Sequence, residues 1–346
     1  MASRLLQPDD RGIACPLGRF WIDPWKPVPL AVVTHGHSDH ARPGMGRYIA
    51  AEPGVPVLRK RLGAGAEITG VPYGEVVRLA DVEVSFHPAG HCLGSAQVRV
   101  ESGGEVAVAA GDYKRAADPT CAPFEVVRCD TFVTEATFAL PIYRWYPAAV
   151  IAGEILDWWD ANRESGRVSV LSAYALGKAQ RLLAELARAL DRRREERRRV
   201  FTHGALEPMI GCYRDAGVDM LDTWRIHETS RARGRSNPFA GQLVLATPSA
   251  VGSPWMKRFG PAKSVETAFA SGWMRVRGVR RRRGYDRGFV ISDHADWPGL
   301  VRTCIETGAS HVLCTHGNSG TLARYLRERG VGASPIETAY ETEEAE

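Results

Sequence analysis

The chain has 346 residues, which is long enough for one large domain or two ordinary ones. Hydrophobic residues make up 44% and charged residues 25%, as in other globular proteins, and the formal net charge is +5. It contains no apolar run of 18 residues and no N-terminal secretory pattern, which excludes a membrane-spanning protein from our expectations. Its seven scattered cysteines form no CxxC pair, so we expect free thiols and a cytoplasmic location.

Short apolar segments that end in polar turns recur along the chain. Their length and flanking residues predict buried strands at 30–34, 82–86, 105–110, 131–134, 289–292 and 311–314. Apolar residues at helical spacing predict helices at about 149–162, 177–199, 298–306 and 321–329. Strands and helices in this order indicate an α/β protein.

The middle of the chain reads as a separate α/β block, with strands predicted at 168–171, 200–202 and 243–246. The turns rich in His and Asp avoid this block and resume after it. Insertion of one domain into another produces this order. We therefore divide the chain into residues 1–149, an inserted domain 150–272 and a return segment 273–346.

Arginine is concentrated in two segments, 192–199 and 275–287. Glu195 and Glu196 interrupt the first, which continues a helical pattern, so we expect a solvated helix face there. The second has glycine breaks and aromatic neighbours. It is a candidate for contact with a phosphate backbone, with a solvated loop as the alternative.

The strongest signal is the hexad HGHSDH, which follows the strand predicted at 30–34. It places His35, His37, Asp39 and His40 within six residues and holds three of the ten histidines. Neutral imidazole and carboxylate are good ligands for zinc-class cations. In an extended loop His35 and His37 project to one side, and a turn brings Asp39 and His40 to a second centre. One segment can therefore serve two adjacent cations.

Further candidate ligands stand at the ends of other predicted strands: His91, Asp112 and His316. A carboxylate such as Asp112 can bridge two cations roughly 3.5–4 Å apart, the spacing of two-metal hydrolases. Together with the hexad, these residues predict a dinuclear metal centre with seven ligands. We expect structural roles for the other histidines outside the motifs, His87, His203, His227 and His311.

The hexad, then GH at 90–91, GD at 111–112 and a late histidine, resembles the signature of the metallo-β-lactamase superfamily. Glu135 in TEATF, His294 in ISDHADW and His316 in LCTHGN resemble the three β-CASP motifs, and residues 150–272, with SAYALGKAQRLL, resemble the β-CASP cap. The resemblance covers nearly the whole chain. It is strongest to the bacterial ligase-associated DNA exonucleases, relatives of the Artemis-type DNA nucleases. It implies a metallo-β-lactamase αββα sandwich with an inserted β-CASP α/β cap.

The resemblance also implies roles for individual residues. Two divalent cations, zinc or else manganese or iron, are held by two ligand sets that share Asp112: His35, His37, His91 and Asp112, and Asp39, His40, Asp112 and His316. A water activated between the cations attacks the phosphodiester, Asp39 counts as catalytic as well as ligating, and His294, hydrogen-bonded to Glu135, protonates the departing sugar oxygen.

Four residues are candidates for contact with substrate. Ser172 and Lys178 lie at a predicted strand-to-helix turn, where backbone amides and a lysine favour a terminal phosphate. Tyr113 and Lys114 directly follow Asp112. For all four the alternative is a structural role.

The leading hypothesis is a 5′-to-3′ DNA exonuclease of DNA repair, monomeric and functionally associated with a DNA ligase. One departure from the Artemis-type pattern favours RNA, because those proteins have an apolar residue where this chain has His316. An RNA-processing endonuclease or 5′-exonuclease is therefore the close alternative. A small-molecule metallo-hydrolase would need neither the cap nor His294 with Glu135, and a non-catalytic nucleic-acid-binding subunit would not need the complete ligand set.

Overall fold

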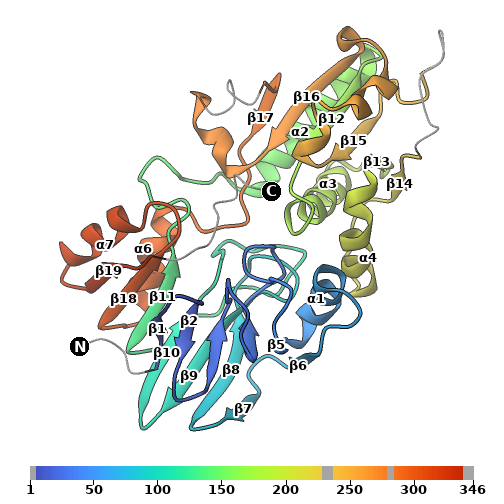
Figure 1. The fold of residues 1–346 in the computed structure, drawn as a ribbon. Coiled ribbons are helices and arrows are strands. Elements are labelled where there is room, and N and C mark those ends of the chain that lie inside the picture. The colour runs from blue at the N-terminus through green and yellow to red at the C-terminus, as the bar shows by residue number, and fades with distance from the viewer. Residues whose placement is uncertain (1–4, 228–236, 279–283, 338–346) are drawn as a thin grey trace. The chain divides into compact units, whose positions relative to one another are not determined.

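The computed structural model describes residues 5–227, 237–278 and 284–337, which fall into two compact units (Figure 1). The first unit takes in the chain up to Arg144 and again from Asp293, and the second unit is the intervening stretch Trp145–Ser292. Both units combine helices with β-sheet, which confirms the predicted α/β class.

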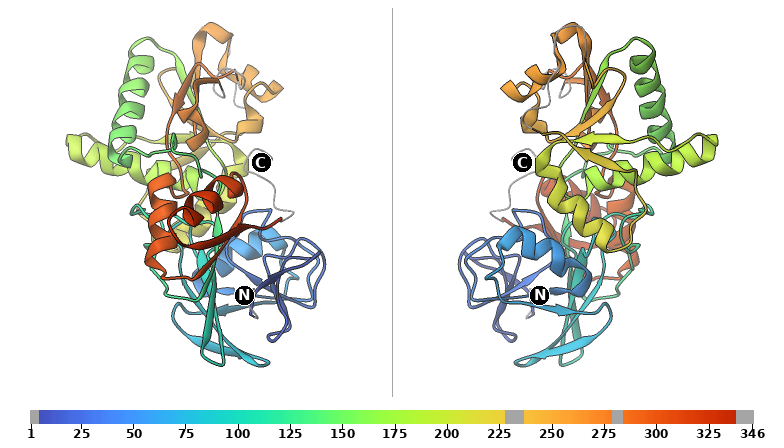
Figure 2. Two further views of the ribbon diagram at one scale, coloured as in Figure 1. Left: turned by 90° about the vertical axis from the view of Figure 1, so that its left-hand side faces the viewer. Right: turned by 90° about the vertical axis from the view of Figure 1, so that its right-hand side faces the viewer.

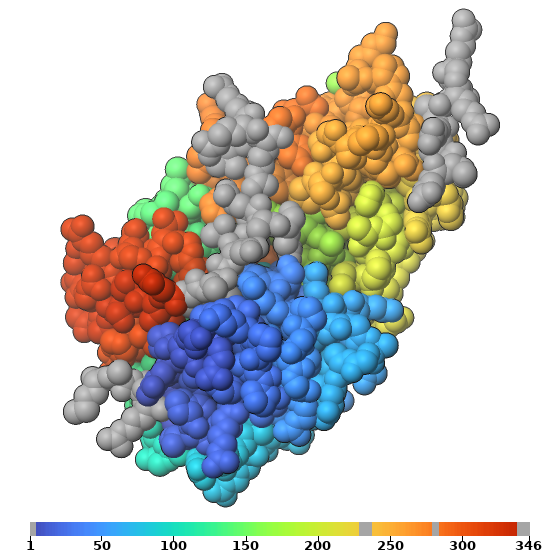
Figure 3. All heavy atoms as spheres, viewed as in Figure 1, coloured from blue at the N-terminus to red at the C-terminus, as the bar shows by residue number. Residues whose placement is uncertain are grey.

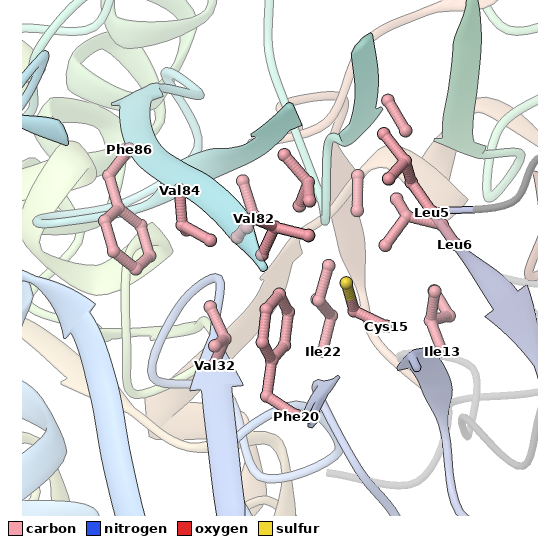
Figure 4. Close-up of a cluster of buried hydrophobic side chains, with 14 of the residues drawn as sticks. Leu5, Leu6, Ile13, Cys15, Phe20, Ile22, Val32, Val82, Val84 and Phe86 are labelled. Carbon is pink, nitrogen blue, oxygen red and sulfur yellow. The ribbon is translucent and has the colours of Figure 1, made fainter. Parts of the chain in front are cut away.

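Two β-sheets form the centre of the first unit. One has six strands in chain order: β1 (Gln7–Pro8), β2 (Ile13–Cys15), β3 (Phe20–Ile22), β4 (Leu30–Val33), β5 (Arg47–Ala51) and β6 (Ile68–Val71). The other has the order β19-β18-β11-β10-β9-β8-β7, with β7 (Val76–Leu79), β8 (Val82–Pro88), β9 (Ala96–Ser102), β10 (Glu105–Ala109), β11 (Thr131–Glu135), β18 (His311–Thr315) and β19 (Gly332–Pro335). Side chains of both sheets meet in one hydrophobic core, in which Val32 and Val84 take part (Figure 4).

Helices cover the outer faces of both sheets. Along β4, Leu30 and Val32 belong to the core between the sheets, whereas Ala31 and Val33 pack with Leu58 of a helix, as the alternation of a strand requires. Two helices, side by side in Figure 2, pack on the outer face of the seven-stranded sheet. The helices of this unit are α1 (Val55–Leu62), α6 (Trp297–Glu306), α7 (Ser319–Arg327) and the 3₁₀ turn η1 (Glu52–Gly54). The layers are thus helix, sheet, sheet, helix.

Four neighbouring strands of the seven-stranded sheet, β10, β11, β18 and β19, run in the same direction. β10 pairs in parallel with β11, and β11 pairs in parallel with β18. Their carboxyl ends therefore meet at one edge of the sheet, and the loops that follow them begin close together. In the facing sheet, β4 ends just before the hexad at 35–40.

The second unit is built on one sheet in which every strand pair is parallel, in the order β14-β13-β15-β12-β16-β17. Its strands are β12 (Val168–Ser172), β13 (Val200–Thr202), β14 (Thr223–Arg225), β15 (Leu243–Ala246), β16 (Val265–Ala270) and β17 (Arg287–Phe289). Its helices are α2 (Ala148–Glu164), α3 (Lys178–Arg193) and α4 (Glu207–Asp215), with 3₁₀ turns η2 (Gly204–Leu206), η3 (Pro248–Ala250), η4 (Pro254–Phe259), η5 (Ala262–Ser264) and η6 (Gly272–Arg275). Parallel strands require such crossover connections.

Two predicted elements differ from the structure. The helix expected over 177–199 ends at Arg193, because Arg194 adopts a left-handed conformation with φ 56° that closes the last turn. The strand expected at 289–292 is wrong in its bounds, because β17 covers Arg287–Phe289 and residues 290–292 are not in a strand. β17 pairs with β16 and so belongs to the sheet of the second unit. None of the described helices combines the length and hydropathy that a membrane span needs.

Candidate metal centre

The structure brings all seven predicted ligands together in two adjoining groups. They come from four loops, each directly following a strand: the hexad after β4, His91 after β8, Asp112 after β10 and His316 after β18. The parallel arrangement of β10 and β18 around β11 explains why residues distant in sequence meet at one edge.

In the first group, ligand atoms of His35, His37, His91 and Asp112 all lie within 4.8 Å of one another. Nδ1 of His37 is 3.0 Å from Nε2 of His35 and 3.0 Å from Nε2 of His91. Oδ2 of Asp112 is 3.5 Å from Nε2 of His35 and 3.8 Å from Nε2 of His91. All four side chains are buried. Three ring nitrogens and a carboxylate thus converge on one point, a donor set typical of a zinc-class cation.

The second group consists of Asp39, His40 and His316, whose ligand atoms also lie within 4.8 Å of one another. Nε2 of His40 is 3.5 Å from Oδ2 of Asp39 and 3.5 Å from Oδ2 of Asp112. The rings of His40 and His316 are stacked at 5.3 Å. Oδ2 of Asp112 therefore stands between the two groups, where a bridging carboxylate is needed.

Unusual backbone conformations place two of these ligands. Gly111, just before Asp112, has φ 57°, and a Cβ at this position would lie 2.6 Å from Oγ1 of Thr34. Glycine therefore lets the loop after β10 pack against the end of β4. His316 has φ 62°, which is uncommon for a residue with a side chain and is often found at functional sites.

Outward-facing ring nitrogens of the ligands are held by hydrogen bonds. Nδ1 of His40 lies 2.7 Å from Oδ2 of Asp23, and Nδ1 of His91 lies 3.0 Å from the backbone oxygen of Asp293. In each case Nδ1–H donates, so Nε2 is the nitrogen that faces the centre, and its lone pair is available for a cation once the ring is neutral. Partners of this kind fix the tautomer and the ring orientation of metal-binding histidines.

Burial controls the charge of the ligands. It lowers the pKa of His35 and His91 well below the usual histidine value and lowers the pKa of His316 to about 3, so these rings are neutral, as ligation requires. Burial raises the pKa of Asp112 to about 7. Burial opposes protonation of His40, but the three carboxylates around it raise its pKa to about 10. Negative charge is thus concentrated beside His40.

The residues of both groups fit divalent cations. Oδ1 of Asp112 is buried and has no hydrogen-bond partner within the described part of the chain. An unsatisfied buried carboxylate oxygen is costly, and coordination of a cation would remove that cost. Imidazole nitrogens and carboxylate oxygens without thiolate suit zinc, manganese or iron.

His294 and Glu135 form a buried acid–imidazole pair beside the first group. Nδ1 of His294 is 2.8 Å from Oε2 of Glu135, and the backbone N–H of Tyr113 donates to Oε1 of Glu135 at 2.9 Å. The rings of His294 and His91 are 4.7 Å apart. Because Glu135 is held by the Tyr113 amide and accepts from Nδ1–H, it fixes the orientation of the imidazole. The structure thus brings this predicted pair to the centre.

Asp23 is a residue of this site that the sequence analysis missed. Besides contacting His40, it accepts hydrogen bonds from the backbone N–H of Thr34 at 2.8 Å and from Oγ1 of Thr34 at 2.6 Å. Asp23 is buried and directly follows β3, so these hydrogen bonds connect the hexad to the end of β3. Its sequence signal is a polar residue after an apolar segment, FWIDP, but that strand is three residues long and was not predicted.

We expect Asp23→Asn to weaken metal binding about 10- to 100-fold, because loss of an outer hydrogen-bond partner typically has this effect. The amide keeps the size of the side chain but no longer provides a carboxylate for Nδ1–H of His40. Competition with a chromophoric chelator measures the affinity, and Asp81→Asn, at an exposed position of the same unit, is the control. An affinity equal to wild type in Asp23→Asn would remove Asp23 from this role.

The four predicted substrate residues are all buried. The hydroxyl of Tyr113 lies 3.0 Å from Oγ1 of Thr134, and Nζ of Lys114 forms an ion pair with Asp118 at 3.2 Å. In the second unit, Nζ of Lys178 lies 5.5 Å from the ring of Tyr174, near Ser172 at the end of β12. The contacts of Tyr113 and Lys114 give these two side chains structural roles, whereas the buried hydroxyl of Ser172 has no hydrogen-bond partner among the described residues. Contact with substrate stays a prediction for all four.

The first arginine segment forms a surface network of ion pairs. Arg193 pairs with Asp157 at 2.6 Å, and Arg197 pairs with Asp191 at 2.7 Å and Asp219 at 2.6 Å. The expected solvation of this segment is confirmed, but the expected helix face is wrong beyond Arg193, where α3 ends. In the second segment, residues 279–283 lie outside the described residues, and the guanidinium of Arg275 lies 5.5 Å from the ring of Tyr146.

Comparison with known proteins places the chain among named relatives, although no family model matches it. It is 29% identical over 331 residues to a "Probable DNA ligase" of Opitutus terrae, covering 94% of this chain and 30% of that protein. It is 22% identical over 173 residues to an "RNase J-like protein" of Methanocaldococcus jannaschii, covering 49% of this chain and 40% of that protein. The chain thus spans well under half the length of either relative.

A solved structure supports the fold. A protein of unknown function from Enterococcus faecalis V583 superposes with a TM-score of 0.56 at 12% sequence identity, covering 90% of this chain and 79% of that chain. A sequence identity of 12% supports similarity of the fold alone.

Proposed function

Since the chain belongs to the β-CASP metallo-β-lactamase family, we propose that it is a metal-dependent nuclease that hydrolyses phosphodiester bonds of DNA. The observation that carries the proposal is the convergence of seven buried or half-buried ligands with the His294–Glu135 pair at one sheet edge. The helix–sheet–sheet–helix unit is then the metallo-β-lactamase sandwich, and the second unit is the inserted β-CASP cap.

In this proposal each residue has one task. His35, His37, His91 and Asp112 hold one divalent cation, and Asp39, His40, Asp112 and His316 hold the other. When bound, the two cations make hydroxide available at neutral pH and offset charge on the phosphate. His294 gives its proton to the sugar oxygen as the phosphorus–oxygen bond breaks, and Glu135 keeps the ring in place. Asp23 acts through His40 as a positioning residue.

The choice between DNA and RNA rests on two named relatives and on His316. The relative named as a probable DNA ligase matches 94% of this chain, which favours DNA as the polymer and association with a ligase. The 5′-to-3′ exonuclease activity in repair is proposed from the resemblance of the sequence motifs. His316 and the RNase J-like relative favour the second candidate, an RNA-processing nuclease. A small-molecule hydrolase is less favoured because it has no use for the His294–Glu135 pair. We further propose that the cations are zinc and that the protein is a monomer. We also propose a cytoplasmic location, because all seven cysteines are free thiols.

Digestion of end-labelled polymers tests the proposal. We expect stepwise release of mononucleotides from 5′-phosphorylated DNA with zinc or manganese, at least about tenfold slower digestion of DNA with a 5′-hydroxyl, and no digestion with EDTA. The matched substrates are RNA of the same sequence with and without the phosphate. Faster digestion of RNA would transfer the assignment to the second candidate, and digestion of neither polymer under any divalent ion would refute a nuclease.

A further inference from the structure

A pocket of the second unit has a lining suited to a ligand. It encloses about 540 Å³ and is lined by residues that include His203, Gly204, Arg225, Ile226, Trp255 and Arg258. This volume lies in the range of small-molecule sites, roughly 300–1,000 Å³. Among the described residues, the lining contains two arginines and two aromatic rings and neither aspartate nor glutamate. Such a lining selects for negative charge next to a flat ring.

The strand order explains why a pocket forms there. All six strands are parallel, so their carboxyl ends share one edge. From β13 the chain runs outward to its neighbour β14, whereas from β15 it runs across β12 to β16 on the other side. The two connections diverge between adjacent strands, which leaves a crevice at the carboxyl ends, the place where open α/β sheets bind ligands. His203 follows β13, and Trp255 follows β15. Atoms of both segments, yellow and light orange, are exposed on the face shown in Figure 3.

Hydrogen bonds hold Arg258 at the pocket, and Arg225 lies exposed at its edge. Nε of Arg258 donates to the backbone oxygen of Trp255 at 2.8 Å, and its Nη1 donates to the backbone oxygen of His227 at 3.1 Å. Arg225 lies against Gly204, where an added Cβ would be 3.2 Å from Nε of Arg225. Arg225 is exposed and makes no ion pair with any described residue. Planar guanidinium groups bind phosphate through paired hydrogen bonds.

The aromatic side chains supply a stacking surface. The rings of Trp255 and His203 meet edge to face at 4.8 Å, and Trp255 packs on Phe259 at 4.9 Å. The guanidinium of Arg258 lies over the Trp255 ring at 5.1 Å, and these contacts fix the indole. Burial, together with Arg258, lowers the pKa of His203, so its ring is neutral. Ile226 adds an apolar wall. Aromatic side chains stack on nucleic-acid bases with little sequence preference.

We propose that this pocket binds a nucleoside phosphate, with the base on Trp255 and the phosphate between Arg225 and Arg258. The group is supplied either by one nucleotide of a nucleic-acid strand or by a free nucleotide. The inference goes beyond the proposed function and does not depend on it, because no residue of the pocket belongs to the metal centre. It also gives His203 a role other than the structural one expected from the sequence.

Calorimetric titration of the full chain in EDTA with AMP, adenosine and inorganic phosphate tests this site. We expect AMP to bind, and adenosine and phosphate to bind at least about tenfold more weakly. Arg225→Ala and Trp255→Ala should each weaken AMP binding about tenfold. Lys257→Ala removes a neighbouring positive charge that does not line the pocket and should leave binding unchanged. Arg225 is exposed, so its variant keeps the test valid even if Trp255→Ala does not fold.

Fluorescence anisotropy with a labelled single-stranded oligonucleotide distinguishes the two sources. If a strand occupies the pocket, AMP competes with the oligonucleotide and Arg225→Ala weakens both. If a free nucleotide does, only AMP binding falls. Absent AMP binding, binding insensitive to Arg225→Ala, or an equal loss in Lys257→Ala would overturn the proposal. If the wild-type chain binds AMP but digests neither DNA nor RNA, the proposed nuclease function fails and the proposal for this pocket stands.

Discussion

Replacing Asp112 by alanine is expected to abolish cleavage, with a loss of about 10³-fold or more. The carboxylate lies between both ligand groups, 3.5 Å from Nε2 of His35 and 3.5 Å from Nε2 of His40, so its removal affects both cations. A bound cation contributes several kcal/mol of transition-state stabilisation, and each roughly 1.4 kcal/mol is a factor of ten in rate. Single-turnover cleavage and metal content by mass spectrometry measure the effect, and His37→Ala should behave alike.

The fold of Asp112→Ala is expected to survive. Burial raises the pKa of this carboxyl to about 7, so keeping it ionised in the folded chain costs free energy. Its Oδ1 has no hydrogen-bond partner among the described residues. Removal therefore takes away no stabilising hydrogen bond of that oxygen. Circular dichroism checks the fold, and Asp81→Ala, an exposed carboxylate of the same unit, is the matched control. Turnover near wild type in Asp112→Ala would refute the ligand assignment.

Sequence patterns anticipated the strands that deliver the site better than its geometry. Residues 200–202 and 243–246 coincide with β13 and β15, and the strand before the hexad ends one residue earlier than expected. Short apolar runs predict buried strands here because they are too short for a helix and are bounded by turn residues, not because of their periodicity. The pattern does not say which strands become neighbours. The adjacent, parallel placement of β10, β11 and β18 is a property of the tertiary structure. It brings Asp112, Glu135 and His316 together.

Features that depend on one specific conformation or contact were hard to predict from the sequence. Asp23 stands alone in the sequence, and only the fold reveals that its carboxylate holds His40. α3 ends where Arg194 adopts a left-handed conformation, which helical periodicity does not encode. Burial of Lys114 likewise depends on Asp118 as its partner. In each case a specific contact outweighs the local pattern.

Replacing His294 by alanine is expected to preserve the metal content but to slow cleavage of DNA about 10²- to 10⁴-fold, the usual contribution of a general acid. The imidazole is bonded through Nδ1 to Glu135 at 2.8 Å and lies beside His91 without being needed by either ligand group. Loss of the ring removes the proton that the departing sugar oxygen takes. Unchanged cleavage in this variant would exclude His294 from that step.

A substrate with a better leaving group separates proton donation from metal binding. A nucleotide p-nitrophenyl ester releases an anion that needs no protonation, so His294→Ala should cleave it at close to the wild-type rate, whereas Asp112→Ala should cleave neither substrate. Glu135→Gln keeps a hydrogen-bond acceptor for Nδ1–H, and we therefore expect it to fall between wild type and His294→Ala on DNA. Because Asp112, Glu135 and His294 also have ligand atoms within 4.8 Å of one another, they could instead hold a cation. An equal loss on both substrates, together with loss of metal, would assign His294 to that role.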